Sequence, residues 1–265
     1  MKKITGLFVA MLLLLSSCGS VPLTGRKQVL LVSDQEVLTS SLTQYSDYMK
    51  SAKKSSSKNG VAMVTRVGKK IATATEQYLK NNGLESEIKN FAWEFNLVSD
   101  KQVNAFCMPG GKIVVYEGLL QVIDSEDELA VVIGHEVAHA VAKHSNERMS
   151  QQLLAQYGAK IISQALSTKS AAIQQIGNSV YGLGAQYGVM LPFSRKHEYE
   201  ADYMGLVFMA MAGYNPQSSI AFWQKMSAGN GGSVPEFAST HPSDAARIAE
   251  IKRRMPEIEK FKMKK

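Results

Sequence analysis

Apolar residues recur at helical spacing in the first half of the chain. Ser33 and Glu36 fit a capping box, and the pattern after them predicts a helix running to about Met49. The polar run KKSSSKNG at 53–60 indicates a loop. Residues 61–83 then repeat apolar positions at helical spacing and end on Asn-Gly, which is typical of a second helix and its stop signal.

Aromatic and β-branched residues replace the helical spacing further along. We expect strands within 91–98, 103–106 and 112–118, joined by turns that include a Pro-Gly-Gly sequence. Residues 19–32, before the first helix, are expected to form an extended tether. These patterns predict an α+β fold that is mainly α, with a small antiparallel β-sheet beside the helix that begins after residue 125.

The second half of the chain predicts helices again. Residues 150–190 are rich in Ala, Gln, Gly and Ser, and they are expected to be helical but are too polar to span a membrane. Ser194 caps a further helix, and a shorter one follows around 217–227. The last helix is expected from Ser243 to about Met255.

One apolar helix carries unexpected polar residues. After a capping Ser125, the run ELAVVIGHEVAHAVA places His135, Glu136 and His139 in the middle of a segment that should be buried. Histidines at i and i+4 share one helix face and can converge on one metal ion, while the glutamate next to the first ligand suits a general base. This is an H-E-x-x-H motif. His144 lies off the ligand face and is interpreted as a surface residue.

A zinc ion held by two histidines needs a third protein ligand and an open position. The segment SRKHEYEADYMG supplies Glu198, with Asp202 one turn later on the same face, where it can hold a ligand histidine by its other N–H. Glu200 lies about 200° around the helix from Glu198 and is the weaker candidate, as is His197. The sequence therefore predicts one Zn²⁺ per chain, bound by His135, His139 and Glu198.

The N-terminus has the features of an export signal. A positive MKK precedes the short apolar run GLFVAMLLLL, and LSSC follows with small residues. Leu15 to Cys18 resemble a bacterial lipobox, so we expect cleavage before Cys18 and lipid on the new terminus. The expected location is the cell envelope, lipid-anchored at the outer membrane and facing the periplasm. The outer membrane is preferred because Gly19 replaces the aspartate that often signals inner-membrane retention.

The formal net charge of +7 does not change this interpretation. It comes from lysines in two polar stretches, 53–58 and 260–265, which are expected to be solvated and could contact anionic lipid. No nucleic-acid-binding motif accompanies the charge, so nucleic acid is not expected as a partner. If Cys18 is lipidated, Cys107 is the one thiol left, which excludes an internal disulfide; a buried apolar role suits it better than a nucleophilic one.

Four segments in order resemble a known family. They are NAFCMPGGKIVVYEGLL, VVIGHEVAHAVAKHSNER, FSRKHEYEADYMG and STHPSDAARIAEI. They are similar to the gluzincin zinc metallopeptidases of the HtpX, BepA and LoiP type, relatives of the CAAX prenyl proteases, over more than half of the chain. The resemblance implies a zincin-type peptidase fold, and the lipobox indicates a lipoprotein member. The family's Glu-x-x-Ala-Asp pattern places the third ligand on Glu198.

The resemblance also implies roles for two other segments. In the first segment, the family places an edge strand beside the cleft, where an extended substrate adds as a β-strand, here along Asn104, Ala105 and Phe106. In THPSDAAR, His241 and Arg247 match a motif whose histidine can occupy the zinc's fourth position and latch the site. Stabilisation of the oxyanion by either residue, or simple capping by this turn, remains an alternative.

The expected organisation has four parts: a lipoprotein signal peptide at 1–17, a lipid-anchored tether and helix at 18–60, a zinc metallopeptidase domain at 61–256 and a basic tail at 257–265. The function expected is an endopeptidase that cleaves unfolded or misassembled envelope proteins. A latched, non-proteolytic assembly factor for envelope proteins is the main alternative, and a thiol enzyme using Cys107 is another. The sequence indicates no oligomeric state.

Overall fold

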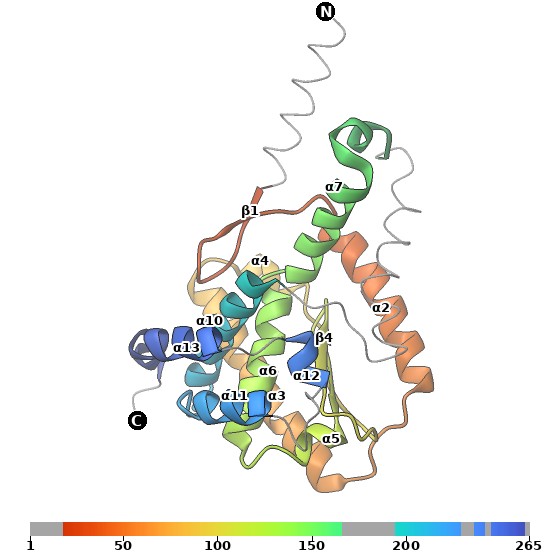
Figure 1. The fold of residues 1–265 in the computed structure, drawn as a ribbon. Coiled ribbons are helices and arrows are strands. Elements are labelled where there is room, and N and C mark those ends of the chain that lie inside the picture. Colours follow the sequence, from red (N-terminus) through yellow and green to blue (C-terminus); the bar gives the residue numbers. More distant parts are fainter. Residues whose placement is uncertain (1–17, 166–193, 229–235, 242–244, 263–265) are drawn as a thin grey trace, which may run out of the picture.

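Helices dominate the computed structural model, which describes residues 18–165, 194–228, 236–241 and 245–262 (Figure 1). The mainly helical α+β fold is confirmed. The helices are α2 (Asp34–Ser51), α3 (Lys58–Asn81), α4 (Glu85–Ile88), α5 (Glu117–Leu120), α6 (Glu126–Val141), α7 (His144–Ala165), α10 (Arg195–Met211), α11 (Ser218–Ala228), α12 (Glu236–Thr240), α13 (Ala245–Ile258) and the 3₁₀ helix η2 (Glu259–Phe261). The strands are β1 (Cys18–Ser20), β2 (Lys27–Val29), β3 (Glu94–Val98), β4 (Ala105–Met108) and β5 (Lys112–Tyr116).

The main sheet is mixed, which corrects the expectation of an antiparallel one. Its strand order is β3-β5-β4, with β4 antiparallel to β5 and β3 parallel to it. A tight turn through Gly110 and Gly111, both with positive φ, reverses the chain between β4 and β5. The chain also reverses between β3 and β4, so β3 and β5 run in the same direction. Because β5 lies in the middle, β4 forms an edge of this sheet.

Helix α6 lies at the centre of the molecule (Figure 1). It packs against α3, α10, α11 and β4, and nearly all of its residues are buried. Gly134 of α6 and Gly205 of α10 meet backbone to backbone: a Cβ added at Gly134 would lie 2.7 Å from the carbonyl oxygen of Gly205. The two glycines therefore let α6 and α10 cross closely, one residue before His135.

The segment expected as an extended tether is folded onto the domain. Residues 18–29 form a hairpin in which β1 and β2 pair antiparallel. Val21 and Val32 are buried, and the backbone N–H of Leu31 donates to Ser150 Oγ on α7. The apolar positions of this segment thus complete the core. No helix in the described ranges has the length and apolar character needed to cross a membrane.

The remaining helices agree with the periodicity, with changes at their ends. Ser33, Ser125 and Ser194 all cap helices as predicted, whereas α3 already begins at Lys58, inside the expected loop. Part of the expected tail continues α13 into η2, with Ile258 buried. The predictions for residues 1–17, for most of 150–190 and for the start of the last helix at Ser243 fall outside the described residues.

Candidate metal centre

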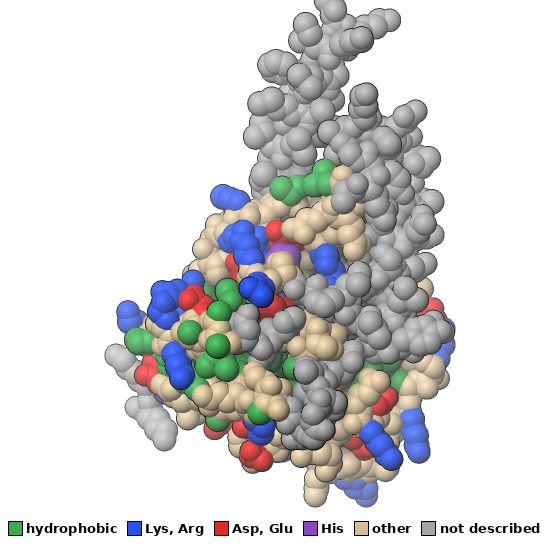
Figure 2. Space-filling view, viewed as in Figure 1, with side chains coloured by type: hydrophobic (Ala, Val, Ile, Leu, Met, Phe, Trp, Pro, Cys, Tyr) green, Lys and Arg blue, Asp and Glu red, His purple; other side chains and the backbone are tan. Residues whose placement is uncertain are grey.

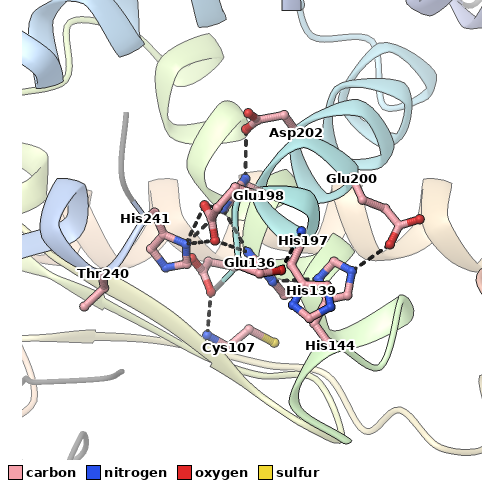
Figure 3. Close-up of polar contacts among 12 residues, drawn as sticks. Cys107, Glu136, His139, His144, His197, Glu198, Glu200, Asp202, Thr240 and His241 are labelled. Carbon is pink, nitrogen blue, oxygen red and sulfur yellow. Dashed lines mark hydrogen bonds and ion pairs between the residues drawn. The ribbon is translucent and has the colours of Figure 1, made fainter. Parts of the chain in front are cut away.

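Four side chains from three parts of the chain converge beside α6 (Figure 3). His135 and His139 come from α6, Glu198 from the first turn of α10, and His241 directly follows α12. One donor atom from each lies within 4.8 Å of the others, and all four residues are buried. The i,i+4 spacing thus places both α6 histidines on the face that meets α10.

The spacing of these donor atoms tests whether a metal ion fits. His135 Nε2 lies 3.0 Å from His139 Nε2, 3.1 Å from His241 Nδ1 and 3.3 Å from Glu198 Oε2. Glu198 oxygens lie 3.5 Å from His139 Nε2 and 3.2 Å from His241 Nδ1. Zinc–nitrogen bonds of 2.0–2.1 Å in a tetrahedron require ligand atoms about 3.3 Å apart. The three nitrogens and one carboxylate therefore fit a tetrahedral zinc ion.

Burial and charge act together on the titratable groups of this cluster. Burial lowers the pKa of His135, but its contacts with Asp202 and Glu198 outweigh that effect and raise the pKa to about 9. Burial, assisted by His135, lowers the pKa of His139 well below its ordinary value. Burial works against ionisation of Glu198, yet His241 and His135 hold its pKa well below the usual range. An ionised carboxylate beside a neutral imidazole is a donor set that suits a divalent cation.

Two buried residues hold the cluster from behind. Asp202 Oδ1 lies 3.0 Å from His135 Nδ1, which leaves His135 Nε2 facing the other donors. Arg247 donates from Nε and Nη2 to the two oxygens of Asp202, and from Nη1 to the backbone carbonyl of His241. Arg247 Nη1 also lies 3.1 Å from Glu198 Oε2, and its guanidinium stacks on Trp223. Arg247 thus ties α10 to the segment that carries His241.

Glu136 points its carboxylate at the same cluster from the other side. The backbone N–H of Cys107, in β4, donates to its Oε2 over 2.9 Å. Within the described part of the chain Oε1 accepts no hydrogen bond, and it lies 3.3 Å from His241 Nε2. Burial raises the pKa of Glu136, although His241 and His135 partly offset this. A fixed carboxylate with one oxygen directed into the site is what a general base requires.

The comparison with known proteins now decides the family. A model described as Peptidase family M48 matches residues 66–255. The chain belongs to Peptidase family M48. This confirms the peptidase family that the four sequence segments resemble; its lipoprotein character stays a prediction.

Curated relatives of this M48 chain come from mitochondria and from bacteria. Mitochondrial metalloendopeptidase OMA1 of Schizosaccharomyces pombe is 38% identical over 176 residues, covering 66% of this chain and 50% of the relative. Metalloendopeptidase OMA1, mitochondrial, of Homo sapiens is 28% identical over 254 residues, covering 91% and 46%. Beta-barrel assembly-enhancing protease of Escherichia coli (strain K12) is 29% identical over 169 residues, covering 61% and 34%. The chain thus spans at most about half the length of these three relatives.

His144 is the site residue that the sequence interpretation placed wrongly. It is fully buried rather than on the surface, and its Nδ1 lies 2.8 Å from His139 Nδ1. The error arose from extending α6 too far: α6 ends at Val141, Lys143 adopts a φ of +56°, and His144 starts α7 in a new direction. A helical projection of α6 therefore does not apply to His144. Burial lowers its pKa to about 4.

The two rival ligands of the M48 site lie outside the four-donor cluster. Glu200 Oε2 lies 3.0 Å from His144 Nε2, and its carboxylate pairs with Arg26. His197 Nε2 lies 3.0 Å from Glu147 Oε2. The preference for Glu198 over these two thus agrees with the geometry, although ligation itself stays a prediction.

The predicted substrate strand is the edge strand β4. Tyr116 N–H donates to Asn104 O, so alternation directs the backbone groups of Ala105 and Cys107 away from β5, toward the open edge. The N–H of Ala105 donates to the side-chain oxygen of Asn104, and that of Cys107 is bound to Glu136. The Cys107 thiol is buried, and burial raises its pKa well above the usual value, which argues against a thiolate nucleophile.

Proposed function

We propose that this chain is a zinc-dependent endopeptidase in which His135, His139 and Glu198 hold one Zn²⁺ and Glu136 is the general base. The observation that carries the proposal is the tetrahedral spacing of the donor atoms with the Glu136 carboxylate directed at them. Membership of family M48 and the printed names of the relatives, all metalloendopeptidases or proteases, support the same reaction.

The residues of the chain divide the reaction between them. A bound zinc ion supplies a Lewis acid that polarises a carbonyl and acidifies water. Glu136 accepts the proton of the attacking water at Oε1 and returns it to the leaving nitrogen, since its Oε2 stays fixed by Cys107 N–H. Asp202 keeps His135 in the tautomer that presents Nε2, and Arg247 keeps Asp202 ionised by direct pairing.

His241 is proposed to latch the site. Its Nδ1 lies in the four-donor cluster, at the position that a catalytic zinc keeps open for water and substrate. Its carrier α12 also covers the edge of the sheet, because Phe237 N–H donates to Val103 O beside β4 (Figure 1). Turnover then requires His241 and α12 to move aside together. We expect His241→Ala to raise peptide cleavage; equal or lower cleavage with zinc fully bound would contradict the latch.

Unfolded or misassembled proteins are the proposed substrates. Once α12 has moved, the carbonyl groups of Ala105 and Cys107 face an edge where an extended chain can pair through its own backbone. Main-chain pairing selects extended conformation more than side-chain identity. The bond to be cut would then lie near Glu136, because Cys107 N–H contacts that carboxylate directly.

An apolar pocket beside the cluster suggests where a substrate side chain would bind. It lies between α2, α4 and α6 and reaches His139. Its apolar lining includes Val37, Leu38, Phe91 and Pro109, with Lys143 at its edge. A strand extending past Met108 would direct a side chain toward this pocket, so we expect an apolar residue in the cleaved sequence near the scissile bond.

The proposed location is the bacterial cell envelope, with lipid on Cys18 and the domain facing the periplasm at the outer membrane. The lipobox-like sequence and the name of the Escherichia coli relative, Beta-barrel assembly-enhancing protease, support it. On the face shown in Figure 2, lysine and arginine side chains are scattered among acidic ones, so this face offers no broad basic surface for nucleic acid.

Replacing the general base tests the activity. Glu136→Gln should keep bound zinc and lose cleavage of casein or an unfolded protein by several orders of magnitude, because the amide cannot accept the proton. Cys107→Ser is the matched control at the neighbouring position and should retain activity. Cleavage that persists in Glu136→Gln, or that vanishes only in Cys107→Ser, would contradict the proposal.

A latched assembly factor is the second candidate, because the four-donor cluster of the structure includes His241 and is closed. Comparing cleavage by the wild type and His241→Ala separates the two functions. Turnover by either protein supports the peptidase. Zinc-loaded proteins that both fail to cleave unfolded substrates support the assembly factor.

A further inference from the structure

A chain of polar contacts runs from the N-terminal hairpin to the proposed ligand His139. His139 Nδ1 lies 2.8 Å from His144 Nδ1, and His144 Nε2 lies 3.0 Å from Glu200 Oε2. All three residues are buried (Figure 3). This chain is separate from Glu136, Asp202 and His241, and the proposed reaction makes no use of it.

The far end of the chain is fixed by the hairpin. Arg26, in the loop between β1 and β2, donates from Nε to Glu200 Oε2 over 2.7 Å, and from its two terminal nitrogens to Glu147. Thr24 Oγ1 donates to the other oxygen of Glu200. Both oxygens of Glu200 therefore have partners on the hairpin, which prevents the carboxylate from rotating away from His144.

Proton positions along this chain are consistent with a metal ligand at its end. If His139 Nε2 presents its lone pair to zinc, Nδ1 must carry the hydrogen. Nδ1–H then donates to His144 Nδ1, and His144 Nε2–H donates to the ionised Glu200. Each contact has one donor and one acceptor, so the tautomer that zinc needs is the tautomer that the chain stabilises.

The arrangement repeats, with one added ring, the support of the other ligand. His135 is held by a carboxylate, Asp202, which is itself held by an arginine, Arg247. His139 is held by His144, which is held by a carboxylate and then by an arginine. Metal-bound histidines commonly depend on such partners for orientation and basicity.

We propose that His144 and Glu200, anchored by Arg26 of the N-terminal hairpin, are positioning residues that orient His139 for zinc. This inference rests on the proposed zinc site. It extends that site to the hairpin at residues 18–29, which would otherwise be a peripheral appendage. Removing the acceptor on His144 or the charge on Glu200 should then weaken metal binding without touching a ligand.

The chain offers a matched control for the charge. Glu147 and Glu200 both pair with Arg26 at 2.7 Å, but Glu147 contacts His197 while Glu200 contacts His144. Glu200→Gln should weaken zinc affinity, measured by competition with a chromophoric chelator, by about 10–100-fold. Glu147→Gln should stay within about threefold of the wild type, since it leaves the partner of His139 in place.

A second pair of variants tests His144 itself. His144→Phe keeps a ring but removes the acceptor, and it should weaken zinc affinity as Glu200→Gln does. His144→Gln offers an amide oxygen in place of Nδ1 and should recover part of the affinity. The absorption spectrum of bound Co²⁺ should shift in His144→Phe and Glu200→Gln but not in Glu147→Gln, because it reports ligand geometry directly.

The outcomes separate this inference from the proposed function. Equal losses of affinity in Glu200→Gln and Glu147→Gln, or unchanged affinity and Co²⁺ spectra in Glu200→Gln and His144→Phe, would overturn the inference alone. Thermal unfolding of the zinc-free proteins identifies any variant whose loss comes from misfolding, and such a variant is replaced by its partner in the pair. Failure of the wild type to bind zinc would overturn the proposed function and this inference with it.

Discussion

At the residue scale, the two α6 histidines have opposite electrostatic surroundings. Contacts with Asp202 and Glu198 raise the pKa of His135 to about 9 against the effect of burial, whereas burial and His135 lower that of His139. Without metal, His135 therefore carries a proton at neutral pH, and this charge stabilises the zinc-free fold. That contribution is complete below the ordinary pKa of about 6.5 and is lost as pH rises through 9.

Zinc binding should therefore release a proton from His135. Metal ligation needs the neutral imidazole, so we expect zinc affinity to fall by up to about tenfold for each pH unit below 9. Calorimetric titration at pH 7.5 in buffers of different ionisation enthalpy would measure close to one proton released per zinc. Asp202→Asn, which removes the carboxylate that raises this pKa, should release less. Proton release that is absent in the wild type would contradict the assignment of His135.

How far the site could be predicted also depends on single residues. The positions of His135, Glu136 and His139 follow from helical spacing, and that of Glu198 from a second helix with the same logic. His144 was missed because the positive φ of Lys143 redirects the chain, and the local sequence AKHS gives no glycine to signal the turn. A histidine nine residues after His135 was the available signal.

At the scale of elements, the crossing of α6 and α10 sets the distance between the two ligand helices. Gly134 and Gly205 touch there, and a Cβ on Gly205 would lie 2.7 Å from the backbone nitrogen of His135. Glu198 lies on α10, so any widening of the crossing moves it away from His135 and His139.

Gly205→Ala should therefore both destabilise the fold and weaken zinc binding. Overpacking of this kind lowers the free energy of unfolding by about 1–3 kcal/mol. Urea unfolding measures the first effect and chelator competition the second. Ser46→Ala, an exposed change on α2 to the same residue, should alter neither. Wild-type zinc affinity in Gly205→Ala would show that the crossing does not set the ligand distance.

The elements themselves were mostly predictable, and their pairing was not. Helical periodicity and serine caps located α2, α3, α6 and α10, because these signals are local. The parallel pairing of β3 with β5 depends on which strand lies in the middle, and no local pattern encodes that order. The packing of residues 18–29 was missed because Val21 and Val32 show their role only when the surface they cover is known.

At the scale of the whole molecule, a bound ion would join parts of the chain that are distant in sequence. The four donor residues span positions 135 to 241 and come from α6, α10 and the end of α12. Arg247 on α13 reinforces the same junction through Asp202 and the carbonyl of His241. Removing the ion should therefore affect global stability and not only the site.

Chelation should lower the unfolding temperature in calorimetry. Zinc at 100 times its dissociation constant stabilises a native state by about 2.7 kcal/mol, which is lost when the metal is withdrawn. His135→Ala serves as the control, because its unfolding temperature should no longer respond to zinc or chelator. An unfolding temperature of the wild type that is the same with and without zinc would contradict a site that binds the ion in the native state.

The pattern of backbone groups along β4 has a consequence for inhibitor design. Ala105 and Cys107 offer carbonyl acceptors at the edge, while their N–H groups are already bound. A peptide aligned there must contribute its own amide hydrogens at alternate residues. Methylating the backbone nitrogen at those residues should abolish affinity, whereas methylating the intervening ones should be tolerated. A two-register N-methyl scan of a bound peptide would thus reveal its alignment on the enzyme without a co-crystal structure.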